Sequence, residues 1–447
     1  MGRLNSIRKS IKKRFDEINN EAVKRNIMQG LPFWVGSAIT GIIAVFYAYL
    51  FGWAEDFALF ILHSNKWLMF ISAPLFFYLG WYLVKRFAGT ARGSGIPQVM
   101  ASIELATPKN NFLVDRLLSF RIMCVKVASS ILMVMGGGAI GREGPTIQIA
   151  GSVFRFVNNL IPESWPKVSK RNMIMTGAAA GLAAAFNTPL GGVVFAVEEL
   201  SKGQFRHFRT ALFSAVIIAG LTAQWLLGPY LYLGYPELNH LKWYIIFIVI
   251  LVGVIAGIAG ASMARFILKI LQWRSGFSFK KQMLFLFGCA ILMAGFGVFW
   301  GELAIGSGKE IMTETLFTDE KVVAWYTPIL RIIGPAASFS AGGAGGIFAP
   351  SLGAGASIGS VLAGIFGITN ENANILIMSG MVAFLTGVTR SPFTSAILVL
   401  EMTDRHSVIF HLMIAALLAN LAAYIIDKKS FYDHLKEDYI KEVQTGQ

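Results

Sequence analysis

Five consecutive residues, Gly141-Arg142-Glu143-Gly144-Pro145, could form an anion site, because they place a helix start between two apolar runs. Pro145 suits the first turn of a helix, where its missing N–H would have no partner in any case. That turn presents unpaired backbone N–H groups and the positive end of the helix dipole, so it can bind an anion. Glu143 could occupy such a site itself, or it could take up a proton and leave. On its own, the pattern would also fit an ordinary acidic residue near a helix N-terminus.

A second possible set of anion ligands is the sequence Gly93-Ser94-Gly95-Ile96-Pro97. Two glycines flank one hydroxyl, and a proline follows at a position where a helix can start. Such a turn exposes the Ser94 hydroxyl together with neighbouring N–H groups. Taken alone, this pattern also fits a plain turn.

The composition indicates an integral membrane protein. The chain has 447 residues, of which 55% are hydrophobic and 14% charged, and its mean hydropathy is +0.59. Soluble domains average about 25% charged residues. Many apolar runs approach the ~20 residues of a bilayer crossing, and these lie at 33–51, 67–84, 122–140, 211–227, 243–263, 283–300 and 375–388. Runs 147–157 and 351–366 are short or glycine-rich, which predicts helices that end part-way through the membrane. We therefore expect an all-α polytopic fold.

The net charge of +14 follows the positive-inside rule and does not indicate a nucleic-acid partner. Basic residues crowd the N-terminus before the first apolar run, whereas acids such as Glu55 and Glu310 lie in segments predicted on the opposite side. Residues 1–30 are predicted to form a basic amphipathic helix on the inner membrane surface. The N-terminus is therefore expected in the cytoplasm.

Neither metal chemistry nor catalysis is indicated by the residues. The chain contains no H-E-x-x-H or P-loop pattern, and its few intramembrane acids form no recognisable catalytic pair. Cys124 and Cys289 both fall within apolar runs, which favours small buried hydrophobic residues over a disulfide or a metal site. A membrane-embedded enzyme is the alternative class, but we expect a protein that is not an enzyme.

The sequence contains an internal duplication. Residues 185–198 align with residues 388–401, so that Pro189 pairs with Pro392 and Glu198 with Glu401. Further upstream, Gly345-Gly346-Ile347-Phe348-Ala349-Pro350 is the counterpart of the helix start at Pro145. The order of both elements predicts two membrane repeats, 31–202 and 203–425, followed by a short cytoplasmic segment, 426–447. The shared offset of Glu198 and Glu401 suggests a structural role common to both halves.

Repeats with interrupted helices place the binding sites of many transporters near the bilayer midplane. An inverted arrangement of the two repeats would bring the two glycine-proline helix starts toward each other. Two positive dipole ends and their N–H groups would then surround one small anion.

Three motifs, at 93–97, 141–145 and 345–350, together resemble the selectivity motifs of the CLC family of chloride channels and chloride/proton exchangers. The resemblance runs in order over about residues 30–435. It implies a homodimer whose subunits each have a pore, built from inverted repeats of tilted and broken helices. Because the chain ends soon after Tyr432, the resemblance is to the prokaryotic type without cytoplasmic regulatory domains.

The resemblance also implies roles for individual residues. Ser94 and the N–H groups of Ile347 and Phe348 would bind a central chloride. Arg142, Gly144, Gly346 and Ala349 would line an outer site through their N–H groups. The coordinating tyrosine best matches Tyr432, although Ser430 stands where the family has proline, and Tyr424 and Tyr439 are the alternatives. The combination of Ser94 and Pro145 favours chloride over nitrate or fluoride.

Two acids would handle protons in this family. Glu143 matches the external gating glutamate, and Glu199 occupies the position of the internal proton-transfer glutamate of the exchangers. A solvated acid balancing nearby Arg206 and Arg209 is the alternative for Glu199. We therefore predict a chloride/proton antiporter with bound chloride and no other cofactor, in a bacterial inner membrane, with both termini cytoplasmic. A proton-gated chloride channel is the main alternative, and a fluoride or nitrate exchanger is a further one.

Overall fold

The computed structural model describes residues 21–161, 165–166, 168–201, 209–228, 231–238, 242–368 and 371–445. Within these ranges every regular element is a helix, and the β-type contacts are two isolated bridges, Gly93 with Ala344 and Gly141 with Gly346. The prediction of an all-α fold is confirmed.

The helices fall into a first and a second half of the chain. The first half contains α2 (Glu21–Ser64), α3 (Met69–Phe87), α4 (Ile96–Leu105), α5 (Phe120–Met135), α6 (Glu143–Asn159), α7 (Lys170–Phe186), α8 (Pro189–Phe195), the π-helical turn η4 (Ala196–Leu200) and α9 (Arg209–Leu227). The second half contains α10 (Ile245–Ser275), α11 (Phe279–Trp300), α12 (Lys309–Phe317), α13 (Thr327–Ser340), α14 (Phe348–Ile365), α15 (Ala373–Thr389), α16 (Pro392–Thr403), α17 (Ile409–Ile426) and α18 (Phe431–Thr445). Short 3-10 turns at Lys66–Leu68, Gly89–Ala91, Asn111–Arg116, Glu302–Ala304 and His406–Val408 connect some of them.

Eight helices among the described residues are long and apolar enough to cross a membrane. Helix α17 is one of them, although it was not among the predicted segments. Helix α2 is a single helix of 44 residues, so the last part of the predicted surface helix at 1–30 continues directly into the first span. Residues 1–20 of that prediction lie outside the described residues.

The same neighbours pack together in both halves of the chain. Helix α6 packs on α7 as α14 packs on α15, and α2 packs on α9 as α10 packs on α17. The ends of α7 and α15 match in detail, because Asn187 and Arg390 both adopt the left-handed conformation, with φ of 56° and 63°. This repeated packing agrees with duplication. The predicted boundary at 202/203 falls among residues outside the described ranges, so it stays a prediction.

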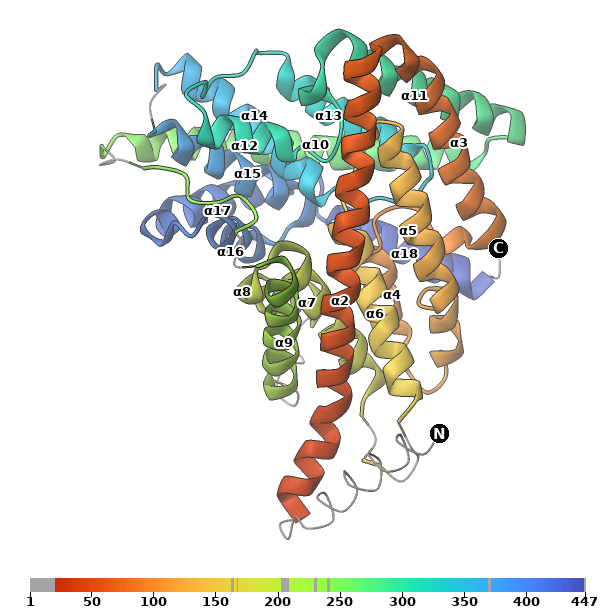
Figure 1. Cartoon of the computed structure of the whole chain (residues 1–447). Helices are drawn as coiled ribbons and strands as arrows, with labels where there is room; N and C mark the ends of the chain where they lie inside the picture. The colour runs from red at the N-terminus through yellow and green to blue at the C-terminus, as the bar shows by residue number, and fades with distance from the viewer. Residues whose placement is uncertain are drawn as a thin grey trace.

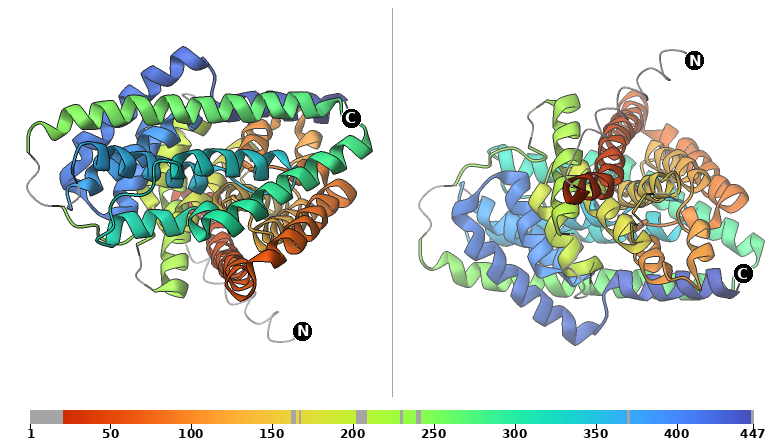
Figure 2. Two further views of the ribbon diagram at one scale, coloured as in Figure 1. Left: turned by 90° about the horizontal axis from the view of Figure 1, so that it is seen from above. Right: turned by 90° about the horizontal axis from the view of Figure 1, so that it is seen from below.

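The view in Figure 1 shows how these helices cross. Helix α2 runs almost the full height of the molecule, beside α6 and α9. Helix α10 extends along one edge of the molecule, and α18 lies beside its far end (Figure 2). Helices α6 and α14 begin inside the protein, where Glu143 and Phe348 are each only 1% exposed. Both helices therefore start in the protein interior, although α14, with 18 residues, is also one of the eight helices long enough to cross a membrane.

Small residues let these helices approach closely, as is typical of membrane interiors. A Cβ on Gly257 of α10 would lie 2.6 Å from the Ala419 Cα of α17, and a Cβ on Gly355 of α14 would overlap the Gly380 backbone of α15. Gly355 and Gly359 also give a G-x-S-x-G spacing, but it lies within α14, where the buried Ser357 hydroxyl donates to the Ala354 carbonyl at 2.7 Å. This spacing serves helix packing and does not form the strand-to-helix turn of a nucleophilic serine.

The two cysteines differ from each other. Cys289 on α11 is buried, as predicted, whereas Cys124 on α5 is exposed, so the expectation of a buried side chain was wrong for Cys124. An apolar run predicts a membrane helix, but it does not tell which of its faces packs against protein and which faces outward.

Substitution of Gly257 by leucine should destabilise the protein, because the backbone of α17 leaves no room for a side chain. Overpacking of this kind costs about 1–3 kcal/mol or more. We expect a lower melting temperature in detergent, or loss of the monodisperse species. Gly288→Leu on α11 is the matched control, because nothing lies within 4 Å of a Cβ at that position. Equal melting temperatures for the two variants would contradict this account of packing.

Candidate functional site

Backbone hydrogen bonds join the three glycine-containing motifs. Gly93 N–H donates to the Gly343 carbonyl at 2.8 Å, and Gly345 N–H donates to the Gly93 carbonyl at 3.1 Å. Gly141 and Gly346 exchange a pair of bonds, with N···O distances of 2.7 and 2.8 Å. Segments about 200 to 250 residues apart in the sequence therefore meet at one place, as the inverted arrangement predicted.

The role predicted for Gly346 was wrong. Its N–H donates to the Gly141 carbonyl, so this N–H is not free to bind an anion. Gly346 instead connects the start of α14 to the start of α6. The motif alone could not show this, because the partner carbonyl comes from the other half of the chain.

Two helix starts point into this junction. Helix α6 begins after its N-cap Arg142, and α14 begins after its N-cap Ile347. The first N–H groups of a helix have no intrahelical acceptor, and the prolines at 145 and 350 fall in the first turn of each helix. A Cβ on Gly346 would lie 3.2 Å from the Gly144 nitrogen, which shows how close the two starts are. The N–H groups predicted as anion ligands at Arg142, Gly144, Ile347, Phe348 and Ala349 are thus gathered at two positive helix ends.

The hydroxyl groups of Ser94 and Tyr432 face each other in the interior. Ser94 is 1% exposed and Tyr432 is 0% exposed, and the Ser94 hydroxyl is close enough to act on the Tyr432 hydroxyl. Among the described residues, however, neither hydroxyl oxygen has a partner in good hydrogen-bond geometry. A Cβ on Gly144 would overlap the Ser94 hydroxyl oxygen, so this oxygen lies against the start of α6. An unpaired buried hydroxyl costs about 1–3 kcal/mol. Two such groups directed at each other indicate a ligand that accepts hydrogen bonds from both.

The choice among the three tyrosines follows from their surroundings. Tyr424 is 57% exposed on α17, and the Tyr439 hydroxyl donates to the Arg92 carbonyl at 3.0 Å. Only Tyr432 of these three faces Ser94. Ser430, which replaces the proline of the family motif, accepts a hydrogen bond from Asp433 N–H at 3.0 Å. Serine therefore starts α18 by capping it.

Glu143 is the first residue of α6 and its carboxylate lies between the two helix starts. It packs against Gly141, where a Cβ would overlap its Oε2 atom, and the N–H groups of Ala349 and of Glu143 itself are directed at the carboxylate. Its Oε2 atom has no hydrogen-bond partner in the part of the chain that the structure describes. Glu143 thus occupies a position where an anion would be stabilised, as its place in the sequence predicted.

Glu199 lies on the π-helical turn η4 that follows α8. Turns of this type are rare and occur often at functional sites. The Glu199 side chain is 8% exposed and accepts a hydrogen bond from the Ser391 hydroxyl. The charges of both Glu199 and Glu143 act on the Tyr432 hydroxyl, so the tyrosine lies within electrostatic range of both acids. Arg206, one of the basic neighbours considered for Glu199, lies outside the described residues.

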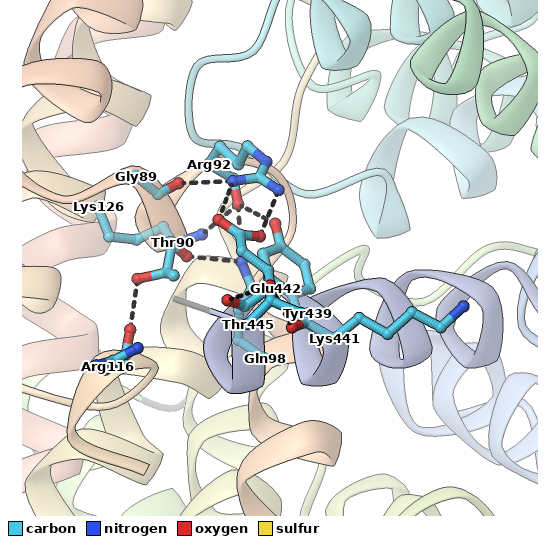
Figure 3. A network of polar contacts seen from close by, with 10 residues as sticks. All are labelled: Gly89, Thr90, Arg92, Gln98, Arg116, Lys126, Tyr439, Lys441, Glu442 and Thr445. Atoms are coloured by element: carbon cyan, nitrogen blue, oxygen red, sulfur yellow. Dashed lines mark hydrogen bonds and ion pairs between the residues drawn. The ribbon is translucent and has the colours of Figure 1, made fainter. Parts of the chain in front are cut away.

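A polar network behind Ser94 was not predicted. The Arg92 guanidinium binds both oxygens of Glu442 on α18, at 2.9 and 2.7 Å (Figure 3). The Arg92 carbonyl accepts hydrogen bonds from Tyr439 at 3.0 Å and from the Gln98 amide at 2.7 Å. These contacts attach α18, which carries Tyr432, to the turn that carries Ser94.

Lys126 completes this network from α5. Its buried ammonium donates to the Gly93 carbonyl at 2.8 Å. It also approaches the Arg92 carbonyl at 3.4 Å (Figure 3). A lysine inside the apolar run 122–140 is costly in a membrane unless backbone carbonyls or acids satisfy it. That charge was the signal in the sequence that could have revealed the network.

Substitution of Tyr432 by alanine should weaken chloride binding by about tenfold, because the anion would lose a hydrogen-bond donor in a dry site. Isothermal titration calorimetry with chloride in detergent would measure this change. Tyr424→Ala removes an exposed tyrosine and should bind chloride as the unmodified protein does. An unchanged dissociation constant in a folded Tyr432→Ala variant would show that Tyr432 does not bind the anion.

Comparisons with known proteins agree with this geometry. The chain is 29% identical over 415 residues to the H(+)/Cl(-) exchange transporter ClcA of Citrobacter koseri, and equally to that of Salmonella arizonae, covering 89% of this chain and 86% of each relative. Among solved structures, a slow cyanobacterial Cl-/H+ antiporter superposes with a TM-score of 0.81 at 24% identity, covering 93% of this chain and 98% of that one. A CLC-type fluoride/proton antiporter superposes with a TM-score of 0.74 at 21% identity, covering 90% and 96%. Residues 75–424 match the family described as voltage gated chloride channel, and the chain therefore belongs to this family.

Proposed function

We propose that this protein is a chloride/proton antiporter. The observation that carries the proposal is that one carboxylate and two unpartnered buried hydroxyls, those of Glu143, Ser94 and Tyr432, lie at two converging helix starts. The relatives described above exchange protons for chloride or fluoride. Ser94 and Pro145 favour chloride, because the resemblance places different residues there in nitrate and fluoride exchangers.

Chloride would bind first at a central site. The Ser94 and Tyr432 hydroxyls donate to it from one side, and the N–H groups of Ile347 and Phe348 donate from the start of α14. No full positive charge is needed, because helix dipoles and N–H groups stabilise an anion that has left water. Helix dipoles and N–H groups hold the ion less tightly than a full positive charge would, so the ion can also leave again, which transport requires.

Glu143 would compete with chloride at an outer site. As a carboxylate it takes the N–H groups of Arg142, Gly144 and Ala349, whereas as a neutral acid it has little affinity for a positive helix end. Proton uptake therefore releases the side chain and admits an ion, and proton loss returns it. The exchange of one anionic group for another keeps the charge at the helix starts nearly constant.

Glu199 would carry the proton on the cytoplasmic side. The Tyr432 hydroxyl lies within electrostatic range of both Glu199 and Glu143, which supports a connection between the two acids. A proton delivered from Glu199 to Glu143 would link each gating event to proton movement. Without that delivery the same gate would give a proton-gated chloride channel.

The assembly and its orientation are part of the proposal. We place the protein in a bacterial inner membrane, with both termini in the cytoplasm and lipid around it. Large apolar side chains are exposed on the repeat-related helices α9 and α17, including Ile217, Leu221, Leu417 and Leu421. With α8 and α16 beside them, these helices would form the contact with a second copy in a homodimer.

Liposomes containing the purified protein provide the direct test. A pH gradient alone should drive chloride uphill, because each proton that moves down its gradient is exchanged for chloride. Chloride and proton fluxes would be recorded together with electrodes in the same sample. If the voltage of zero current does not change with the pH gradient, the protein is a channel and not an antiporter.

Neutralising each acid should separate the two fluxes. Glu143→Ala should leave passive chloride flux with no coupled proton movement. Glu199→Gln should lower proton flux by about tenfold or more while chloride continues to move, because the positioned proton carrier is gone. Glu437→Gln, at an exposed acid paired with Lys429, is the control and should transport normally. Normal proton flux in Glu199→Gln would exclude the role given to Glu199.

A further inference from the structure

Helices α8 and α16 cap each other across the two halves of the chain. Glu198, which follows α8, accepts hydrogen bonds from Phe393 N–H at 3.1 Å and from Thr394 N–H at 2.7 Å. In return, Glu401 near the end of α16 accepts bonds from Leu190 N–H at 3.0 Å and Gly191 N–H at 2.6 Å. A carboxylate is well placed at a helix N-terminus, where N–H groups are unpaired and the dipole is positive. The shared structural role predicted for Glu198 and Glu401 is confirmed.

This mutual capping fixes the residue just before α16. Ser391 precedes Pro392 and is 2% exposed, and its hydroxyl donates to the Glu199 carboxylate. The other acceptor within reach is the Thr389 carbonyl, at 3.5 Å, which is the limit of a hydrogen bond. Because a hydroxyl has one proton to donate, Ser391 gives it to Glu199.

The contact between Ser391 and Glu199 has no equivalent in the other half of the duplication. The residue equivalent to Ser391 is Thr188, whose buried hydroxyl has no hydrogen-bond partner among the described residues. The partner of Glu199 is Met402, because Glu198 aligns with Glu401. The π-helical turn is likewise confined to Ala196–Leu200, whereas α16 is regular through Thr403. The capping by glutamate therefore occurs in both halves of the duplication, whereas the serine–glutamate contact occurs at one of the two equivalent positions.

We propose that Ser391 is a positioning residue for proton transfer, one that holds the Glu199 carboxylate in the orientation from which its proton reaches the anion site. Glu198 contributes to this positioning indirectly, because it caps the N-terminus of α16 and Ser391 is the residue just before that helix. A hydrogen bond to a charged group is strong enough to select one orientation of a buried side chain. The inference rests on the proposed function, because it assigns Ser391 a task only if Glu199 carries protons.

The test compares three variants in liposomes, with chloride and proton fluxes recorded together. Ser391→Ala should lower proton flux by about fivefold or more, while chloride flux stays within about twofold of the unmodified protein, because only the hydrogen bond to the carboxylate is lost. Ser391→Thr keeps the hydroxyl and should restore the flux ratio. Ser395→Ala is the matched control. It also removes a buried serine hydroxyl from α16, but that hydroxyl donates to the Ser391 carbonyl at 2.9 Å and not to Glu199, so the flux ratio should stay as in the unmodified protein.

The outcomes separate this inference from the proposed function. Impaired coupling in Glu199→Gln together with normal coupling in Ser391→Ala would overturn the role of Ser391 alone. A Ser391→Thr variant as uncoupled as Ser391→Ala would also overturn it, because a hydroxyl would then not be what matters. Normal coupling in Glu199→Gln would remove the proposed function of Glu199 and this inference with it.

Discussion

The paired backbone bonds between Gly141 and Gly346 are the contact on which the rest of the site depends. The two glycines are equivalent positions of the duplicated motif, four residues before Pro145 and Pro350. A pair of reciprocal bonds between equivalent residues brings two helix starts together with their positive ends side by side. That arrangement is unfavourable by itself, because like dipole ends repel. An anion or a carboxylate between them removes the repulsion, which explains why Glu143 lies there.

The duplication supplies a nearly symmetric frame, and the chemistry comes from where the two halves differ. Glu143 aligns with Phe348, and Glu199 aligns with Met402. Both acids that we assign to proton movement therefore belong to the first repeat, while the second repeat contributes N–H groups and the Ser391 hydroxyl. Symmetric elements such as the capping by Glu198 and Glu401 hold the frame. In the proposed antiporter, loss of symmetry at a few positions then allows one pathway to transport both chloride and protons.

Helix α18 connects the C-terminal part of the chain to the first repeat at the site. Tyr432 reaches Ser94 because α18 is attached to the first repeat through Arg92, Glu442 and Tyr439. The Arg92–Glu442 pair is only partly buried, yet it is bidentate, which makes it one of the stronger types of ion pair. The turn that carries Ser94 is held from the other side by Lys126. Both hydroxyl donors of the proposed chloride site are thus held by the same network.

Most membrane helices, the helix starts and the duplication could be predicted from the sequence, because each depends on short-range patterns. An apolar run of sufficient length must form a helix in lipid, since backbone groups have no water to bind there. A proline after glycines indicates where a helix can begin, and so the helix starts near Pro145 and Pro350, with Glu143 at the first, could be predicted from residue types. The roles of the Ile347 and Phe348 N–H groups came from the resemblance to the CLC family. Duplication was visible because Pro and Glu recur at the same offset.

The tertiary structure decided which of these groups are available for chemistry. Gly346 has an N–H like its neighbours, but a carbonyl from the other repeat uses it. Three tyrosines were candidates, and their environments separate them: Tyr424 is exposed, the Tyr439 hydroxyl donates to the Arg92 carbonyl, and the buried Tyr432 hydroxyl faces Ser94. The π-helical turn and the Ser391 contact depend on how α8 meets α16, which no local pattern encodes. The physical reason is that each hydrogen-bonding group can be used once, and its partner is chosen by residues far away in the chain.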